Sequence, residues 1–187
     1  MPTTKRAIKK DLVALVVVVL AFSAAIIVAK TSRQKFSDTE FAAKAAQGGK
    51  AEVQLGKLAE KKGQSEAVRA FGHRMADDHA AANKTLAKVA RKEKINLPKE
   101  LDKESQETYD RLAKLSGPDF DRSYVQDMIN DHKKDVSEFK KEASDGKNET
   151  IRTFAAETLP TLQDHLKAAR EMKDVVSPKP QPIPNIK

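Results

Sequence analysis

The chain has 187 residues, which is enough for one domain with a substantial core and too few for two domains of ordinary size. It has no cysteine or tryptophan, 7 glycines and 5% aromatic residues, while 33% of its residues are charged. This composition favours helices over a β-sandwich. The lack of cysteine excludes disulfides, thiolate metal sites and cysteine nucleophiles.

The net charge of +8 is concentrated at the N-terminus. Residues 1–30 hold five Lys or Arg and one Asp, which leaves 30 basic and 26 acidic residues, a net charge of +4, in residues 31–187. In that part the two signs are interspersed, and no basic block is interleaved with aromatic residues as a nucleic-acid surface requires. We therefore expect no nucleic-acid partner.

An apolar run, LVALVVVVLAFSAAIIVA at residues 12–29, follows a short basic segment. As a helix the run would be about 27 Å long, close to the hydrocarbon thickness of a bilayer at about 30 Å. Small residues at 21 and 23–25 offer a signal-peptidase site, but the run continues past them, which favours a retained anchor. Residues 1–30 are thus predicted to be a signal peptide or a membrane anchor, with an exported body and the membrane as partner. The sequence does not identify a protein partner.

Four long helices are predicted after a linker at residues 31–37. SDTE at residues 37–40 is typical of a capping box that begins the first helix, and Gly63 ends it. Ser65 is a good N-cap for the second. Pro160 lies inside the fourth helix and is expected to bend it. In chain order, the helices are expected to cover about residues 38–62, 66–92, 119–144 and 149–176.

The connections between these helices predict the topology. The second and third are separated by a long stretch in which Leu101, Thr108, Leu112 and Leu115 have helical spacing, so a short extra helix is expected there. The other connections are short. Short, long and short connections predict an all-α, ferritin-like four-helix bundle with one crossover, over residues 38–176. The Pro-rich tail, 177–187, is expected to be extended, either as a ligand for a partner domain or as a disordered end.

The inward stripe of each helix is interrupted by one ionisable residue: Glu52, His79, His132 and His165 in chain order. The fourth histidine, His73, lies off the stripe and is predicted to be at the surface. In the first helix the expected stripe consists of Phe41, Ala45, Gly48, Leu55 and Ala59.

All four interruptions lie near the middle of their helices, so they are expected to meet in one central layer. Burying such groups without partners costs about 2 to 7 kcal/mol each, so they must bind one another, water or an ion. Three imidazoles and a carboxylate are suitable ligands for Zn²⁺, Cu²⁺, Fe²⁺ or Mn²⁺. One hypothesis is therefore a transition-metal site at Glu52, His79, His132 and His165. The other is a hydrogen-bond network that fixes helix register in a non-catalytic envelope or stress-related interaction protein.

Residues next to the histidines leave further alternatives open. Each of the three histidines follows an aspartate, namely Asp78, Asp131 and Asp164. These carboxylates either orient a histidine on a neighbouring helix or face solvent. Met75 and Met128 precede two of the histidines by four residues and are either soft metal ligands or core residues, with the second favoured. Ferritin-type Glu-x-x-His pairs are absent, which disfavours a di-iron oxidase.

Four segments resemble a bacterial family called domain of unknown function 4142, often labelled a predicted outer membrane protein. They are FAAKAAQGGKAEVQLGKLA, FGHRMADDHAAANKTL, LSGPDFDRSYVQDMINDHKKDVSEF and FAAETLPTLQDHLKAA, and they span residues 38–174. The resemblance implies a ferritin-like helical fold and includes the positions of Glu52, His79, His132 and His165. It implies no activity. Together with the N-terminal apolar run, it predicts a body in the bacterial cell envelope, periplasmic and anchored to the inner membrane or secreted.

Overall fold

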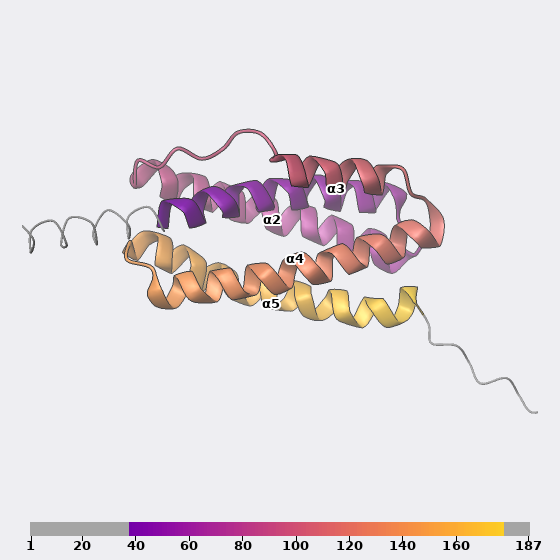
Figure 1. Ribbon diagram of the computed structural model, residues 1–187. Coiled ribbons are helices and arrows are strands. Elements are labelled where there is room, and N and C mark those ends of the chain that lie inside the picture. Colours follow the sequence, from indigo (N-terminus) through magenta and orange to yellow (C-terminus); the bar gives the residue numbers. More distant parts are fainter. Residues whose placement is uncertain (1–37, 178–187) are drawn as a thin grey trace, which may run out of the picture. The chain divides into compact units, whose positions relative to one another are not determined.

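Residues 38–177 are described by a computed structural model, and every regular element among them is a helix (Figure 1). The first helix, described over residues 38–62, is followed by α2 (Glu66–Lys92), α3 (Lys103–Ala113), α4 (Gly117–Asp145) and α5 (Glu149–Val176). This confirms the predicted all-α fold. The predicted N-terminal apolar helix at residues 12–29 and most of the Pro-rich tail lie outside the described residues. Within residues 38–177, no helix is both long and apolar enough to cross a bilayer.

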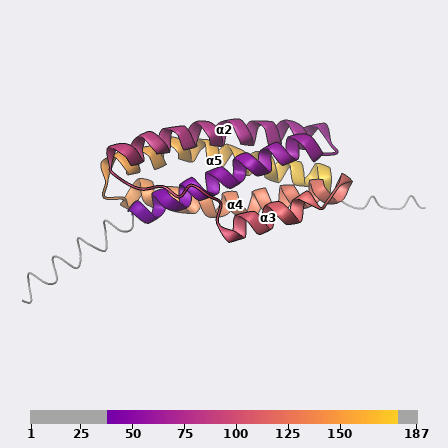
Figure 2. The ribbon, with the colours of Figure 1, turned by 90° about the horizontal axis from the view of Figure 1, so that it is seen from above.

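The four long helices lie side by side, and the short helix α3 packs outside them against α4 (Figure 2). Two apolar clusters occupy opposite ends of the bundle. The first helix and α5 run from the cluster around Phe139 and Phe154 toward the cluster around Phe120 and Tyr124, whereas α2 and α4 run the opposite way. Because α2 and α4 are parallel, the chain must cross the length of the bundle between them, as the long connection predicted.

Side-chain caps set the helix boundaries. The side chain of Ser65 accepts a hydrogen bond from the backbone of Val68 at the start of α2, and Asn148 caps α5 in the same way. The predicted bounds of α2 and α5 are confirmed. By contrast, α4 begins two residues before the predicted Asp119, because Pro118 fits the first turn of a helix.

The first helix and α2 form one helical hairpin, and α4 and α5 form the other. A carboxylate from each hairpin binds the loop of the other. Asp121 of α4 accepts hydrogen bonds from the backbone N–H groups of Gln64 and Ser65, at 2.8 and 2.9 Å. Asp38, in the first helix, accepts from the backbone N–H groups in the loop between α4 and α5, the shortest at 2.7 Å from Asn148. Both carboxylates are buried. The predicted capping box stays a prediction, because Ser37 lies outside the described residues.

The buried face of the first helix differs from its predicted stripe near its N-terminal end. Ala45 and Gly48 are half-buried, whereas Ala42, Ala46 and Gly49 are buried. The prediction was wrong there because an alanine-rich segment has little contrast between its faces.

Further along, the first helix and α2 approach closely at a pair of glycines. A Cβ placed on Gly56 would lie 2.6 Å from the carbonyl oxygen of Gly72, and one on Gly72 would lie 2.7 Å from the carbonyl oxygen of Gly56. This close approach joins the helices that carry Glu52 and His79.

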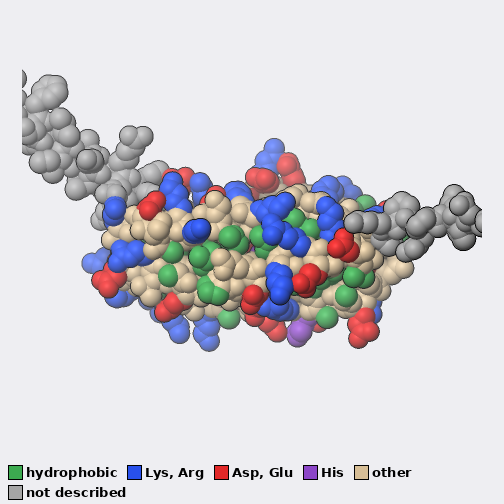
Figure 3. All heavy atoms as spheres, turned by 90° about the horizontal axis from the view of Figure 1, so that it is seen from below, with side chains coloured by type: hydrophobic (Ala, Val, Ile, Leu, Met, Phe, Trp, Pro, Cys, Tyr) green, Lys and Arg blue, Asp and Glu red, His purple; other side chains and the backbone are tan. Residues whose placement is uncertain are grey.

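The surface carries charges of both signs. On the face shown in Figure 3, acidic and basic side chains are interspersed between smaller apolar areas. Val175 is the one large apolar side chain that is exposed among the described residues.

Candidate metal centre

A polar layer separates the two apolar clusters at the middle of the bundle. Each long helix contributes one residue, and these are the four that interrupt the predicted stripes: Glu52, His79, His132 and His165. Glu52 and His79 are 3% and 6% exposed, and His132 and His165 are fully buried. One ring nitrogen from each of the three histidines lies within 4.8 Å of the others. The structure thus brings together the side chains that the sequence singled out.

The innermost pair, His132 and His165, is held in defined tautomers. His132 Nδ1 lies 3.1 Å from the backbone carbonyl of Met128, which only accepts, so this nitrogen carries the proton. His165 Nε2 lies 2.8 Å from a carboxylate oxygen of Asp78 and donates to it in the same manner. The two remaining nitrogens, His132 Nε2 and His165 Nδ1, face each other at 3.3 Å.

The electrostatics keep both of these rings neutral. Burial lowers the pKa of His165 to about 4, against the opposing effect of its hydrogen bond to Asp78. Burial also lowers the pKa of His132, and the nearby His79 adds to the effect. At neutral pH the two facing nitrogens therefore both present lone pairs, so neither donates a hydrogen bond to the other.

Glu52 and His79 form the other half of the layer. The Glu52 carboxylate lies 2.7 Å from His79 Nε2 and 3.2 Å from His132 Nδ1. Although burial opposes both charged forms, the mutual attraction prevails: the pKa of Glu52 falls to about 2, and that of His79 rises. Neither carboxylate oxygen nor His79 Nε2 takes part in a well-directed hydrogen bond. The four groups are close together but poorly satisfied by one another.

The three aspartates that precede the histidines have different roles. Asp78 orients His165 on the neighbouring α5, as one alternative predicted, and it also pairs with Arg74 at 3.3 Å. Asp164 is exposed, as the other alternative predicted. Asp131 is exposed as a residue, but its carboxyl group lines a cavity. Burial of that group, followed by the charge of Glu52, raises the pKa of Asp131 to about 6.

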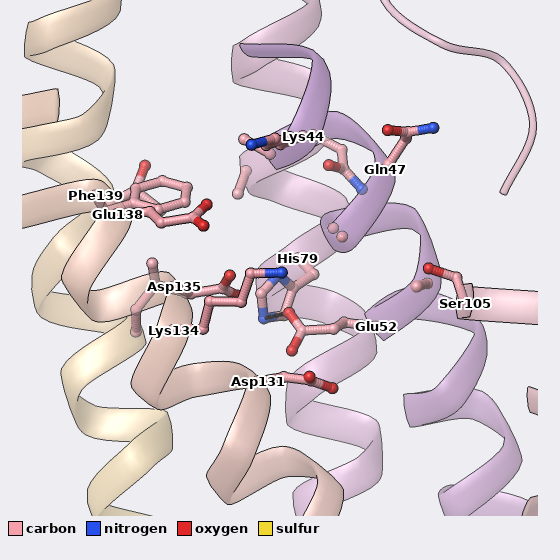
Figure 4. A pocket seen from close by; sticks show the side chains of 18 of the residues that line it. Lys44, Gln47, Glu52, His79, Ser105, Asp131, Lys134, Asp135, Glu138 and Phe139 are labelled. Atoms are coloured by element: carbon pink, nitrogen blue, oxygen red, sulfur yellow. Dashed lines mark ion pairs between the residues drawn. The ribbon is translucent and has the colours of Figure 1, made fainter. Parts of the chain in front are cut away.

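The cavity has a volume of about 340 Å³ and adjoins the polar layer (Figure 4). Glu52 and His79 belong to its wall, and so do Asp131 and Asp135 of α4, which lie beside them in Figure 4. The pKa of Asp135 lies well above its usual range, because the group is buried and close to Glu52. Sequence reasoning did not single out Asp135. Its signal was the spacing of Asp131 and Asp135, four residues apart and hence on one helix face.

The methionines belong to the core. Met75 and Met128 are fully buried in the apolar cluster around Phe120 and Tyr124. This confirms the favoured interpretation of both as core residues. His73, with its side chain 62% exposed and near Glu60 and Asp77, is the predicted surface histidine.

Comparisons with known proteins agree with this architecture. A family model described as Domain of unknown function (DUF4142) matches residues 24–172. No curated protein matches the chain. Among solved structures, the crystal structure of a DUF305 fragment from Deinococcus radiodurans is similar, with a TM-score of 0.66 and 13% sequence identity. The similarity covers 74% of this chain and 96% of that one, and it supports the fold alone.

Proposed function

The chain belongs to the DUF4142 family, whose description gives no activity, and we propose from the geometry of the polar layer that it binds a transition-metal ion. His79, His132 and His165 would each supply one imidazole nitrogen. Glu52 would supply a carboxylate oxygen or the balancing charge. Zn²⁺ and Cu²⁺ suit this donor set best, and Fe²⁺ and Mn²⁺ are also compatible with it.

The distance between His132 Nε2 and His165 Nδ1 carries the proposal. Two lone pairs that face each other at 3.3 Å in a buried site repel unless a positive charge lies between them. Two nitrogen ligands at about 2.05 Å from a tetrahedral ion stand about 3.3 Å apart. The separation of this pair is therefore compatible with such an ion, and Met128 and Asp78 direct both lone pairs toward it. A ligand atom of His79 lies within 4.8 Å of the pair.

The other half of the layer supports the same interpretation. Although burial opposes it, the Glu52 carboxylate raises the pKa of His79 and so favours its protonated form when no metal is bound. Metal binding would displace that proton and leave Glu52 to balance the charge of the ion. A purely structural network would instead be expected to satisfy its buried groups, yet three polar atoms of Glu52 and His79 make no well-directed hydrogen bond.

Metal content and thermal stability of the full chain test the proposal. We expect about one Zn²⁺ or Cu²⁺ per chain after dialysis, and an increase in stability of about 2.7 kcal/mol at a free metal concentration 100 times Kd. His132→Gln should abolish tight binding and the stabilisation. His73→Gln, which changes the one surface histidine among the four, should leave both unchanged.

The outcome separates a metal site from a structural network. Wild-type protein that binds neither metal and gains no stability would sink the metal proposal. A loss of stability in His132→Gln, without any metal dependence in the wild type, would favour the structural alternative.

We further propose that residues 38–177 lie outside the cytoplasm in the bacterial cell envelope. The basic residues before the apolar run at 12–29 support a cytoplasmic N-terminus and an exported body. Cell fractionation of the full chain, with N-terminal sequencing of the product, tests this. A retained N-terminus in the membrane fraction indicates an anchor, a shortened product in the periplasm indicates a cleaved signal, and a full-length cytoplasmic product contradicts the proposal.

A further inference from the structure

The cavity gives the polar layer one side on which an ion can approach. Glu52 and His79 belong to the cavity wall, whereas the innermost His132 and His165 do not, and both are fully buried. The Nδ1 edge of the His165 ring faces His132, and the Nε2 edge is occupied by its hydrogen bond to Asp78. The cavity therefore leads to the innermost histidines by way of Glu52 and His79.

The wall of this cavity has more carboxyl groups than basic side chains. It includes two lysines, Lys44 and Lys134, and six carboxylates: Glu52, Asp102, Glu104, Asp131, Asp135 and Glu138. In Figure 4 the side chains of Asp131 and Asp135 lie beside Glu52 and His79. The charge of Glu52 acts on both of them. A small cleft lined mainly by one sign of charge concentrates ions of the opposite sign.

A second observation indicates that the cavity binds a cation and is not merely lined by acidic residues. The Glu52 side chain is only 4% exposed and lines the cavity, yet both of its oxygens lack a well-directed hydrogen bond. The same is true of His79 Nε2, although it lies 2.7 Å from one of those oxygens. Buried groups of this kind are costly unless a partner satisfies them. A cation that arrives through the cavity would do so.

We propose that the cavity is the loading site of the metal centre, where Asp131 and Asp135 hold a hydrated divalent cation and pass it to Glu52 and His79. The inference rests on the proposed function. Carboxylate oxygens suit ions that keep part of their water shell, whereas the imidazoles bind the ion only after it has lost that water. Asp131 and Asp135 thus control how fast the centre fills, and the histidines control how tightly it holds the ion.

Stopped-flow binding of Co²⁺ to the full chain tests the proposal, because tetrahedral Co²⁺ has a visible spectrum that reports the histidine site. We expect Asp131→Asn/Asp135→Asn to reduce the association rate at least about tenfold at low salt, the lower end of electrostatic steering. The final spectrum and the stoichiometry should stay those of the wild type. At 1 M salt, where the Debye length is about 3 Å, the two rates should converge.

A matched control replaces two aspartates outside the cavity. Asp164→Asn/Asp174→Asn removes two exposed carboxylates of α5, neither of which lines the cavity, and should keep the association rate within about twofold of the wild type. If Asp131→Asn/Asp135→Asn does not fold, the two single variants replace it, with an expected loss of about threefold each, the square root of tenfold for two equal contributions.

Two results would overturn the loading site. A normal association rate in the cavity variants, with a normal Co²⁺ spectrum, rejects the loading site and leaves the metal centre intact. The absence of any Co²⁺ spectrum in the wild type rejects the metal centre itself and the loading site with it.

Discussion

His165 Nε2 lies 2.8 Å from Asp78 Oδ2, so a carboxylate on α2 fixes the tautomer of a fully buried imidazole on α5. The consequence appears on the other edge of the ring, where Nδ1 presents its lone pair toward His132 Nε2. Arg74 pairs with the same oxygen of Asp78 at 3.3 Å and helps to keep the carboxylate charged. Asp78 therefore orients a ring of the proposed metal site without belonging to the proposed donor set.

Asp78→Ala should weaken metal binding about 10-fold to 100-fold, the usual effect of removing a residue that orients a metal-ligating histidine. Without Asp78, His165 can place its proton on Nδ1, which removes the lone pair from the site. Asp78→Asn should restore part of the affinity, because its amide oxygen still accepts from Nε2. Titration with Zn²⁺ against a competing chelator measures all three proteins. An affinity of Asp78→Ala equal to that of the exposed-site control Asp164→Ala would contradict this role.

The low pKa of His165 makes the metal-free protein sensitive to mild acid. The folded pKa of about 4 lies below the ordinary value of 6.5, so below pH 6.5 the unfolded chain binds a proton that the folded chain refuses. Stability should fall as the pH drops from about 6.5 toward 4, by roughly 3 kcal/mol in total for this group. Denaturant unfolding in the presence of a chelator should show a shallower loss in His165→Gln than in the wild type. An equal slope in the two proteins would refute the expectation, and His73→Gln serves as the control.

Much of the fold could be predicted because its signals are local. Ser65 and the apolar spacing after it are enough to place α2, and the contrast between long and short connections is enough to predict one crossover. Where a local signal is weak, the prediction failed. The alanine-rich start of the first helix gave no clear inward face, and the buried one includes Ala42 and Ala46 rather than Ala45.

The site was predictable only in part, for a related reason. An ionisable residue on an apolar stripe is visible in the sequence, which identified Glu52, His79, His132 and His165. Contacts between helices are not visible in this way. The partner of Asp78 depends on how α2 and α5 are rotated, and the role of Asp135 depends on a cavity between the first helix and α4. Asp121, 57 residues from Gln64 in sequence, binds a loop that no local pattern associates with it.

Asp121→Ala should destabilise the fold by about 3 kcal/mol, because it leaves two backbone donors, at Gln64 and Ser65, without their charged acceptor. Metal affinity should stay unchanged, since these groups lie at the end of the bundle. Asp119→Ala is the matched control: its side chain is 72% exposed and pairs with Arg122 only at the surface, so the loss should be at most about 1 kcal/mol. Chemical denaturation measures both. Equal losses of unfolding free energy in the two variants would show that the hydrogen bonds of Asp121 to Gln64 and Ser65 add no stability beyond that of a surface ion pair.

Glu142 should make the protein less stable as the pH rises from about 4.5 to about 7. Burial, followed by the charge of Asp38, raises the pKa of Glu142 to about 7. A carboxyl group whose folded pKa exceeds its unfolded value of 4.5 is fully favourable below pH 4.5 and loses that advantage as the pH rises through 7. Glu142→Gln, which stays neutral, should therefore raise the Tm relative to the wild type more at about pH 8 than at about pH 5. Glu171→Gln, an exposed change on α5, should show no such pH dependence. A Tm difference between Glu142→Gln and the wild type that is the same at both pH values would contradict the raised pKa.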